Sequence, residues 1–199
     1  EAGEDPKALE CIPMLKRSDI KKEAAKIVNE ELTVDNSLFL YHDVCTNGIG
    51  YVDLMFKTDS IAPEQIPYLG LLKSVLGYVD TENYTYGELF NEINANTGGI
   101  NCGVEVFDRA DSTEEFQAMF SVRGKALYTK MDFLFKMIGE ILNSSKLEDT
   151  KRLYEIVASV KSRAQVNLTG AGHSTAVLRA AAYSSPMAAF QDEMAGIGY

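Results

Sequence analysis

The chain contains only two histidines, His42 and His173, and they lie far apart in the sequence. A His-x-x-Glu-His zinc site needs two histidines four positions apart, so that both imidazoles project from one helical face with the glutamate as base. Neither histidine has a suitable second ligand at that spacing. We therefore expect no metal ligand in this chain. His42 should lie in a strand, at the surface or half-buried, and His173 at the start of a helix.

Cys45 follows His42 by three residues, a spacing that could suggest a thiolate and its base. In an extended strand, however, those two positions face opposite sides of the sheet, so a small apolar core residue is the favoured interpretation of Cys45. The three cysteines, Cys11, Cys45 and Cys102, are odd in number and widely spaced. That pattern favours reduced, partly buried thiols and a reducing, cytoplasmic compartment over a disulfide framework.

The remaining motifs predict no catalytic residue and no cofactor site. Gly124-Lys125 lacks the flanking residues of a phosphate-binding loop, Gly170-Ala171-Gly172 lacks a third glycine in register, and no Gly-x-Ser-x-Gly elbow occurs. Paired acids are common, and on an acidic chain they are expected at the solvated surface. These pairs are Glu30-Glu31, Glu114-Glu115 and Asp192-Glu193.

Composition narrows the class of protein. The chain has 199 residues, 46% of them hydrophobic, and a formal net charge of -10. Its average field repels phosphate backbones and anionic headgroups, so nucleic-acid and membrane partners are not expected. There is no apolar run of transmembrane length, and the start, Glu-Ala-Gly-Glu-Asp, resembles neither a signal peptide nor an initiator methionine. We expect a soluble piece of a longer protein.

The strand pattern comes first along the chain. Alternating apolar residues predict strands over 27–34 and 38–44, joined by a turn at Asp35-Asn36. Asn47-Gly48 is a second turn signal, and it precedes the strongest strand pattern, at 49–58. These three strands predict an opening β-meander. Later strands are predicted over 100–107 and 115–126.

Helical periodicity predicts five helices, with boundaries set by capping signals. The ranges are 63–79, 85–96, 127–142, a segment from a capping box at Ser145 and Glu148 to Gly170, and 174–183. The resulting class is α+β, a mostly antiparallel sheet with helices packed on one face. Residues 1–23 read as a linker from an upstream half, and residues 24–199 as one α+β domain.

Several stretches resemble one domain of a known peptidase family. They are 46–56 (TNGIGYVDLMF), 63–69 (PEQIPYL) with 71–72 (LL), 86–89 (YGEL) and 97–100 (TGGI), flanked by 12–15 (IPML) with 18–20 (SDI), and by 180–186 (AAAYSSP). In this order they resemble the third domain of presequence-protease-like zinc metallopeptidases, the falcilysin-like subfamily of the pitrilysin and insulinase clan. The resemblance covers nearly the whole chain. It implies the fold of a metalloprotease half, like that of mitochondrial processing peptidase.

The resemblance implies a non-catalytic role. In this family four homologous domains form two bowl-shaped halves that close around a peptide, with zinc in the first domain and a catalytic Arg and Tyr in the fourth. The zinc-motif positions would fall on about Leu71, Ser74 and Val75, and no histidine occurs from Asp43 to Gly172. The zinc would therefore belong to the parent protein's first domain, and this chain alone should be inactive.

The predicted function is a non-catalytic domain of a zinc metalloendopeptidase that encloses and degrades unfolded peptides. Its partners would be the other domains of the same polypeptide and peptide substrates. The sheet face with Tyr51 and Asp53 is the candidate wall of the substrate chamber. Two alternatives stay open from the residues alone. One is a free-standing α+β peptide-binding or assembly module that uses a sheet edge, and the other is a cysteine hydrolase built on Cys45.

Overall fold

A computed structural model describes residues 13–20, 22–23, 26 and 28–196. The chain divides into two compact units, Glu1–Cys45 and Thr46–Tyr199, and each is considered by itself. Much of the predicted linker, residues 1–23, lies outside the described residues, and its boundary with the domain stays a prediction. The turn of 3-10 helix Arg17–Asp19 (η1) is described within it.

The first unit contains one antiparallel hairpin, made of β1 (Glu30–Val34) and β2 (Ser37–Tyr41). Its two turn residues have positive φ, 47° at Asp35 and 66° at Asn36. Asn and Asp tolerate this conformation, and two such residues match the right-handed twist of the flanking strands. The predicted turn is therefore confirmed, although both strands are shorter than expected. Every residue of the two strands is exposed.

The second unit is built on a three-stranded antiparallel sheet. Its strands are β3 (Ile49–Lys57), β4 (Ile100–Arg109) and β5 (Ser112–Leu127), in the order β3-β5-β4. The predicted meander is wrong, because β3 pairs with β5 and not with β2. The turn at Asn47-Gly48 is real, with φ of 53° and 85°. It leads the chain into the sheet, where the Tyr128 N–H donates to the Gly48 carbonyl.

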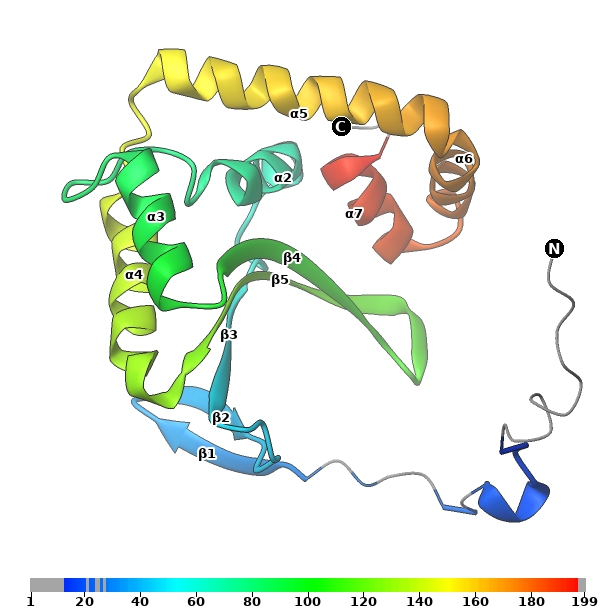
Figure 1. The fold of residues 1–199 in the computed structure, drawn as a ribbon. Coiled ribbons are helices and arrows are strands. Elements are labelled where there is room, and N and C mark those ends of the chain that lie inside the picture. The colour runs from blue at the N-terminus through cyan, green and yellow to red at the C-terminus, as the bar shows by residue number, and fades with distance from the viewer. Residues whose placement is uncertain (1–12, 21, 24–25, 27, 197–199) are drawn as a thin grey trace, which may run out of the picture. The chain divides into compact units, whose positions relative to one another are not determined.

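The helices of this unit cover one face of the sheet (Figure 1). Short 3-10 turns, η2 (Pro63–Gln65) and η3 (Tyr128–Lys130), precede two of them. The α-helices are α2 (Ile66–Val75), α3 (Tyr86–Asn96), α4 (Met131–Ser144), α5 (Thr150–Gly170), α6 (Gly172–Ala181) and α7 (Pro186–Ala195). The predicted α+β class, with helices gathered on one face, is confirmed.

The main core lies between β5 and α4. Phe120, Val122 and Ala126 of β5 face Leu134 and the other apolar residues of α4. The two elements approach closely at Gly124, where an added Cβ would lie 2.6 Å from Leu134 Cδ1. This position needs glycine for packing. Gly124-Lys125 therefore has a structural explanation and no phosphate to bind.

Two helix boundaries differ from the sequence prediction. α2 ends at Val75 and not at Val79, since Gly77 takes a φ of 84° just beyond it. α5 is capped by Asp149, whose side chain accepts from the Arg152 N–H. Ser145 belongs to the end of α4 instead, with its hydroxyl donating to the Ile141 carbonyl at 2.6 Å. The predicted capping box at Ser145 is therefore wrong.

Sequence periodicity did not predict α7, and it contains a buried acid. Asp192 has 1% of its surface exposed and forms an ion pair with Arg179 of α6. That hydrogen bond raises the pKa of the Arg179 guanidinium. Gly70 of α2 has no side chain where the Met194 carbonyl comes close, so α7 can pack on α2. The expectation of a solvated Asp192-Glu193 pair is wrong for Asp192, although Glu193 is exposed.

The close approach at Gly124 can be tested by adding one methyl group. Replacing Gly124 by alanine should lower the free energy of unfolding by about 2 kcal/mol, because the packed core must shift to admit it. Gly139 of α4 is the control, since a Cβ there meets no neighbour within 4 Å. Gly139→Ala should leave stability unchanged or raise it by up to about 1 kcal/mol. Urea unfolding measures both, and equal midpoints for Gly124→Ala and the unchanged chain would contradict the packing.

Candidate functional site

The candidate site is the face of the β3-β5-β4 sheet opposite the helices. Because side chains alternate along a strand, the odd-numbered residues of all three strands lie on this face, while even-numbered ones such as Val52, Cys102 and Val122 pack against the core. Tyr51 is here, with 64% of its surface exposed. Asp53 follows it on β3, directly opposite Arg123 of β5. The two predicted chamber-wall residues therefore lie on one open face, although their role stays a prediction.

A three-membered charge cluster crosses this face. Arg123 Nε donates to Asp53 Oδ2 at 2.7 Å, and Arg123 Nη1 lies 3.2 Å from Glu105 Oε1. The hydrogen bond to Asp53 is the main cause that raises the pKa of Arg123, so the guanidinium stays charged. Exposed pairs of this kind add little stability. Their effect is geometric, because one side chain from each strand is held in a fixed position.

A buried hydroxyl lies beside the cluster. Ser121 precedes Arg123 on the open face, has 1% of its surface exposed and finds no hydrogen-bond partner for Oγ among the described residues. Gly103 lies opposite it on β4, and a Cβ there would lie 3.1 Å from Ser121 Oγ. A buried hydroxyl without a partner is energetically costly. The absence of a side chain at Gly103 leaves the strand backbone accessible next to this donor.

Sequence reasoning missed Ser121, Arg123, Glu105 and Gly103 as members of the site. The alternation of apolar and polar residues in 115–126 predicted which residues of that strand face the core. It could not identify the neighbouring strands. Only the pairing β3-β5-β4 brings Asp53 and Glu105 to either side of Arg123.

The two histidines do not form a metal site. His42 is exposed just past the end of β2, with Nδ1 2.8 Å from the Val28 carbonyl oxygen, and His173 is exposed in the first turn of α6. The surface position of His42 and the helix-start position of His173 are thus confirmed, although His42 lies outside the strand. Within the described residues, no group of three or more His, Cys, Asp and Glu side chains is arranged to hold a metal ion. None of the helices described has the length and apolar character needed to cross a membrane.

The cysteines differ from each other in environment. Cys45 is exposed, so its predicted core position is wrong: the chain leaves β2 at Tyr41 and no strand carries Cys45 into a core. Cys102 is partly buried on the core face of β4, and burial raises the pKa of its thiol to about 11. Cys11 lies outside the described residues.

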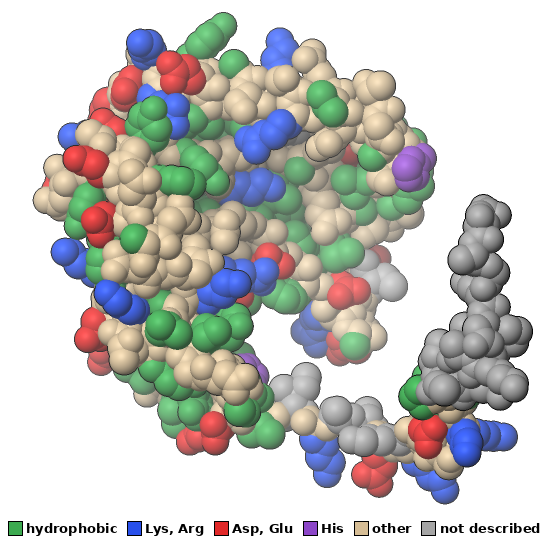
Figure 2. Space-filling view, viewed as in Figure 1, with side chains coloured by type: hydrophobic (Ala, Val, Ile, Leu, Met, Phe, Trp, Pro, Cys, Tyr) green, Lys and Arg blue, Asp and Glu red, His purple; other side chains and the backbone are tan. Residues whose placement is uncertain are grey.

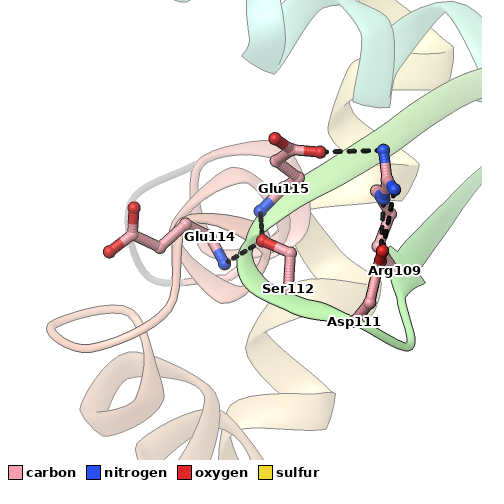
Figure 3. Close-up of polar contacts among 5 residues, drawn as sticks. All are labelled: Arg109, Asp111, Ser112, Glu114 and Glu115. Atoms are coloured by element: carbon pink, nitrogen blue, oxygen red, sulfur yellow. Dashed lines mark hydrogen bonds and ion pairs between the residues drawn. The ribbon is translucent and has the colours of Figure 1, made fainter.

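A second set of charged residues surrounds the turn between β4 and β5 (Figure 3). Arg109 pairs with Asp111 at 3.0 Å and with Glu115 at 3.1 Å, while Ser112 Oγ accepts from the N–H groups of Glu114 and Glu115. As predicted, Glu114 and Glu115 are exposed. This turn forms one side of an open groove of about 840 Å³, and Ser184, Ser185 and Met187, around the start of α7, form the other.

The helix that would correspond to a zinc helix has no zinc ligands. Val75 is buried in a small apolar cluster with Val79 and Ile156, and Leu71 and Ser74 are half-buried. None of these side chains offers the imidazole, thiolate or carboxylate that zinc needs. The residues present at this place do not fit the metal.

Comparisons with known proteins agree with the resemblance seen in the motifs. The model of a family described as associated with peptidases of metallopeptidase family sixteen, subfamily C, matches residues 1–199. "Protein HypA" of Clostridium perfringens is 38% identical over 191 residues, which are 96% of this chain and 20% of that protein.

Two further relatives are named presequence proteases. "Presequence protease, mitochondrial" of Yarrowia lipolytica is 29% identical over 98% of the chain and 20% of its own length. "Presequence protease 1, chloroplastic/mitochondrial" of Arabidopsis thaliana is 28% identical over 100% of the chain and 18% of its own length. The chain thus spans about a fifth of the length of the curated relatives it matches.

The unpaired hydroxyl of Ser121 can be tested by removing it. Ser121→Ala should raise the free energy of unfolding by about 1 kcal/mol, because a buried polar group without a partner is lost. Ser145→Ala is the control, since its hydroxyl donates to Ile141, and it should lower stability by about 1 kcal/mol. Thermal and urea unfolding measure both. A loss of stability in Ser121→Ala would mean that Oγ has a partner in the folded protein.

The reactivity of the cysteines should depend on pH in different ways. With a pKa of about 11, Cys102 is about one-thousandth thiolate at pH 8 and should resist alkylation until the pH approaches 11. Cys45, being exposed, should react at pH 8 in the folded chain. Mass spectrometry after iodoacetamide treatment, with and without urea, locates the modified residues. Equal labelling of Cys45 and Cys102 in the folded chain at pH 8 would contradict the burial of Cys102.

Proposed function

Because the chain belongs to this peptidase-associated family, we propose that it is a non-catalytic domain of a zinc metalloendopeptidase and that its open sheet face forms part of the wall of a peptide-enclosing chamber. The observation that carries the proposal is the asymmetry of the sheet. Helices cover one face, and the other presents Tyr51, Ser121 and the Asp53–Arg123–Glu105 cluster.

The chemistry of the open face suits an extended peptide. Tyr51 offers a large amphipathic surface that can contact varied side chains at small entropic cost. Ser121 offers a hydroxyl without a partner among the described residues, next to the bare backbone at Gly103. Such features bind a chain without demanding one sequence. They agree with a wall that accepts many unfolded peptides.

The electrostatics favour basic peptides. The cluster combines two carboxylates with one guanidinium, so it keeps a net negative charge. The groove at the β4–β5 turn adds Asp108, Asp111, Glu114 and Glu115 against Arg109. With the net charge of -10, these residues raise the local concentration of cationic peptides and accelerate their capture.

The peptide-bond chemistry belongs elsewhere in the polypeptide. α2 has no residue that fits zinc at Leu71, Ser74 or Val75, and the metal of such a peptidase would supply the polarising charge from another domain. This chain would then contribute enclosure and substrate contacts. A free-standing peptide-binding module, which would add a strand at a sheet edge, is the alternative that the experiment below separates.

The wall is tested in the full-length polypeptide with a quenched fluorescent basic peptide. Asp53→Lys and Tyr51→Ala should each raise KM about three- to tenfold with little change in kcat, because they weaken capture and leave the reacting atoms untouched. For Asp53→Lys the KM should also lose part of its salt dependence. Matched controls are Glu148→Lys and Tyr154→Ala, which change exposed residues on or next to α5.

Three outcomes separate the possibilities. A rise in KM confined to the open-face variants supports the chamber wall. An unchanged, equally salt-dependent KM in Asp53→Lys and Tyr51→Ala would contradict it. Cleavage by residues 1–199 alone would mean that this chain has a catalytic site of its own, and binding without cleavage by the full-length protein would favour the binding module.

A further inference from the structure

A basic groove lies between α2 and α5, away from the β4–β5 turn and its groove. Its volume is about 350 Å³. Three cationic side chains and a single carboxylate line it, although the whole chain carries a net charge of -10. Figure 2 shows Lys and Arg side chains over α5 and over α2 at this place. The lining residues are Lys73, Ser74, Tyr78, Arg152, Glu155, Ile156, Ser159 and Arg163.

The groove is long and has an apolar floor. Its α5 residues follow one stripe of the helix, and Arg152 and Arg163 at the two ends are about 16 Å apart along the helix axis, at 1.5 Å per residue. Ile156 between them is buried against Val75 and Val79. The groove therefore has charges at its ends and carbon atoms beneath.

One cation of the groove is already committed to the fold. Arg152 Nε donates to the Tyr78 carbonyl at 2.9 Å, Nη1 lies 3.1 Å from Glu155 Oε2, and the guanidinium stacks 3.9 Å above the Tyr86 ring. Arg152 also neutralises Glu155, the only acid of the groove. It fixes one end of the groove and leaves the other cations unopposed.

Lys73 and Arg163 are the cations that remain. Across the part of the chain that the structure describes, neither takes part in an ion pair with a carboxylate. Ser74 and Ser159 line the same groove with hydroxyls that can donate. These groups form an anion-binding strip that nothing in residues 46–196 fills.

Exposed apolar side chains flank the strip at both ends. Tyr78 has 52% of its surface exposed, and Val166, one turn beyond Arg163 on the same stripe, has 68%. A small free anion would leave both in water. A polypeptide with acidic and apolar residues would cover them, so the surface fits a protein segment better than a phosphate ion.

We propose that an acidic, amphipathic segment of the same polypeptide, from outside residues 1–199, docks in this groove. Its carboxylates pair with Lys73 and Arg163, and an apolar side chain lies over Ile156. Relatives about five times as long supply a large amount of chain for this role. The proposal requires the chain to be part of a longer polypeptide, but it does not require the open sheet face to bind peptides.

Zero-length crosslinking of the full-length protein tests the docking. A carbodiimide joins an amine to a carboxylate only when the two are in contact. Lys73 should crosslink to an Asp or Glu outside residues 1–199, and Arg163→Lys, which keeps the charge, should add a second crosslink to the same segment. Lys151 and Lys161 of α5 do not line the groove and should not join that segment. Mass spectrometry of the digest identifies the linked residues.

A matched pair of double variants tests the energetic coupling. Lys73→Gln with Arg163→Gln should increase hydrogen exchange in the crosslinked segment about tenfold or more, because two charge-assisted contacts are lost. Lys151→Gln with Lys161→Gln removes the same charge from α5 and should leave that exchange unchanged. Neither readout involves peptidase activity, so the chamber proposal can fail while this one stands.

Two results would overturn the docking. One is a Lys73 that crosslinks only within residues 1–199, for example to Glu155, or not at all. The other is protection of Lys73 from acetylation by inorganic phosphate with no crosslink in its absence, which would make the groove a small-anion site.

Discussion

The fold depends on one strand, β5, whose two faces meet different surroundings. Its even-numbered residues Phe120, Val122 and Ala126 are buried against α4, and Gly124 lets the helix come close enough to exclude water. Since side chains alternate along a strand, this packing forces Ser121, Arg123 and Lys125 to the opposite face. A one-residue shift in register would exchange the two sets. The hydrophobic face therefore determines where the polar face lies.

The same constraint explains why the candidate site is a surface and not a catalytic centre. With β5 in the middle, residues from β3 and β4 converge on Arg123 from both sides, and Asp53 and Glu105 hold it in place. The cluster is made of fixed charges without a nucleophile, and the one buried hydroxyl, Ser121, has no base beside it among the described residues. Such a face can hold and orient a chain, which is the part of peptidase function that needs no reacting group.

The sequence allowed prediction of features that depend on neighbours in the chain. The turns at Asp35-Asn36 and Asn47-Gly48 and the capping of α3 by Thr85 and Glu88 all follow from local chemistry. Features set by distant contacts were missed. β3 pairs with β5 across more than sixty residues, and Asp192 is buried only because Arg179 of another helix reaches it. The same limit hid Ser121, Arg123 and Glu105, while the family resemblance came from motifs along the whole chain and was confirmed by the match over residues 1–199.

The helix α2 shows how a domain without metal ligands uses the same element differently. Val75 joins Val79 and Ile156 in a small apolar cluster that fixes α5 against α2. That contact forms the floor of the basic groove and places Lys73 and Ser74 along its side. A histidine or glutamate at position 75 would bury an unpaired polar group and disrupt the cluster. The packing that excludes zinc chemistry from α2 is thus the packing that creates a second binding surface on the outside of the domain.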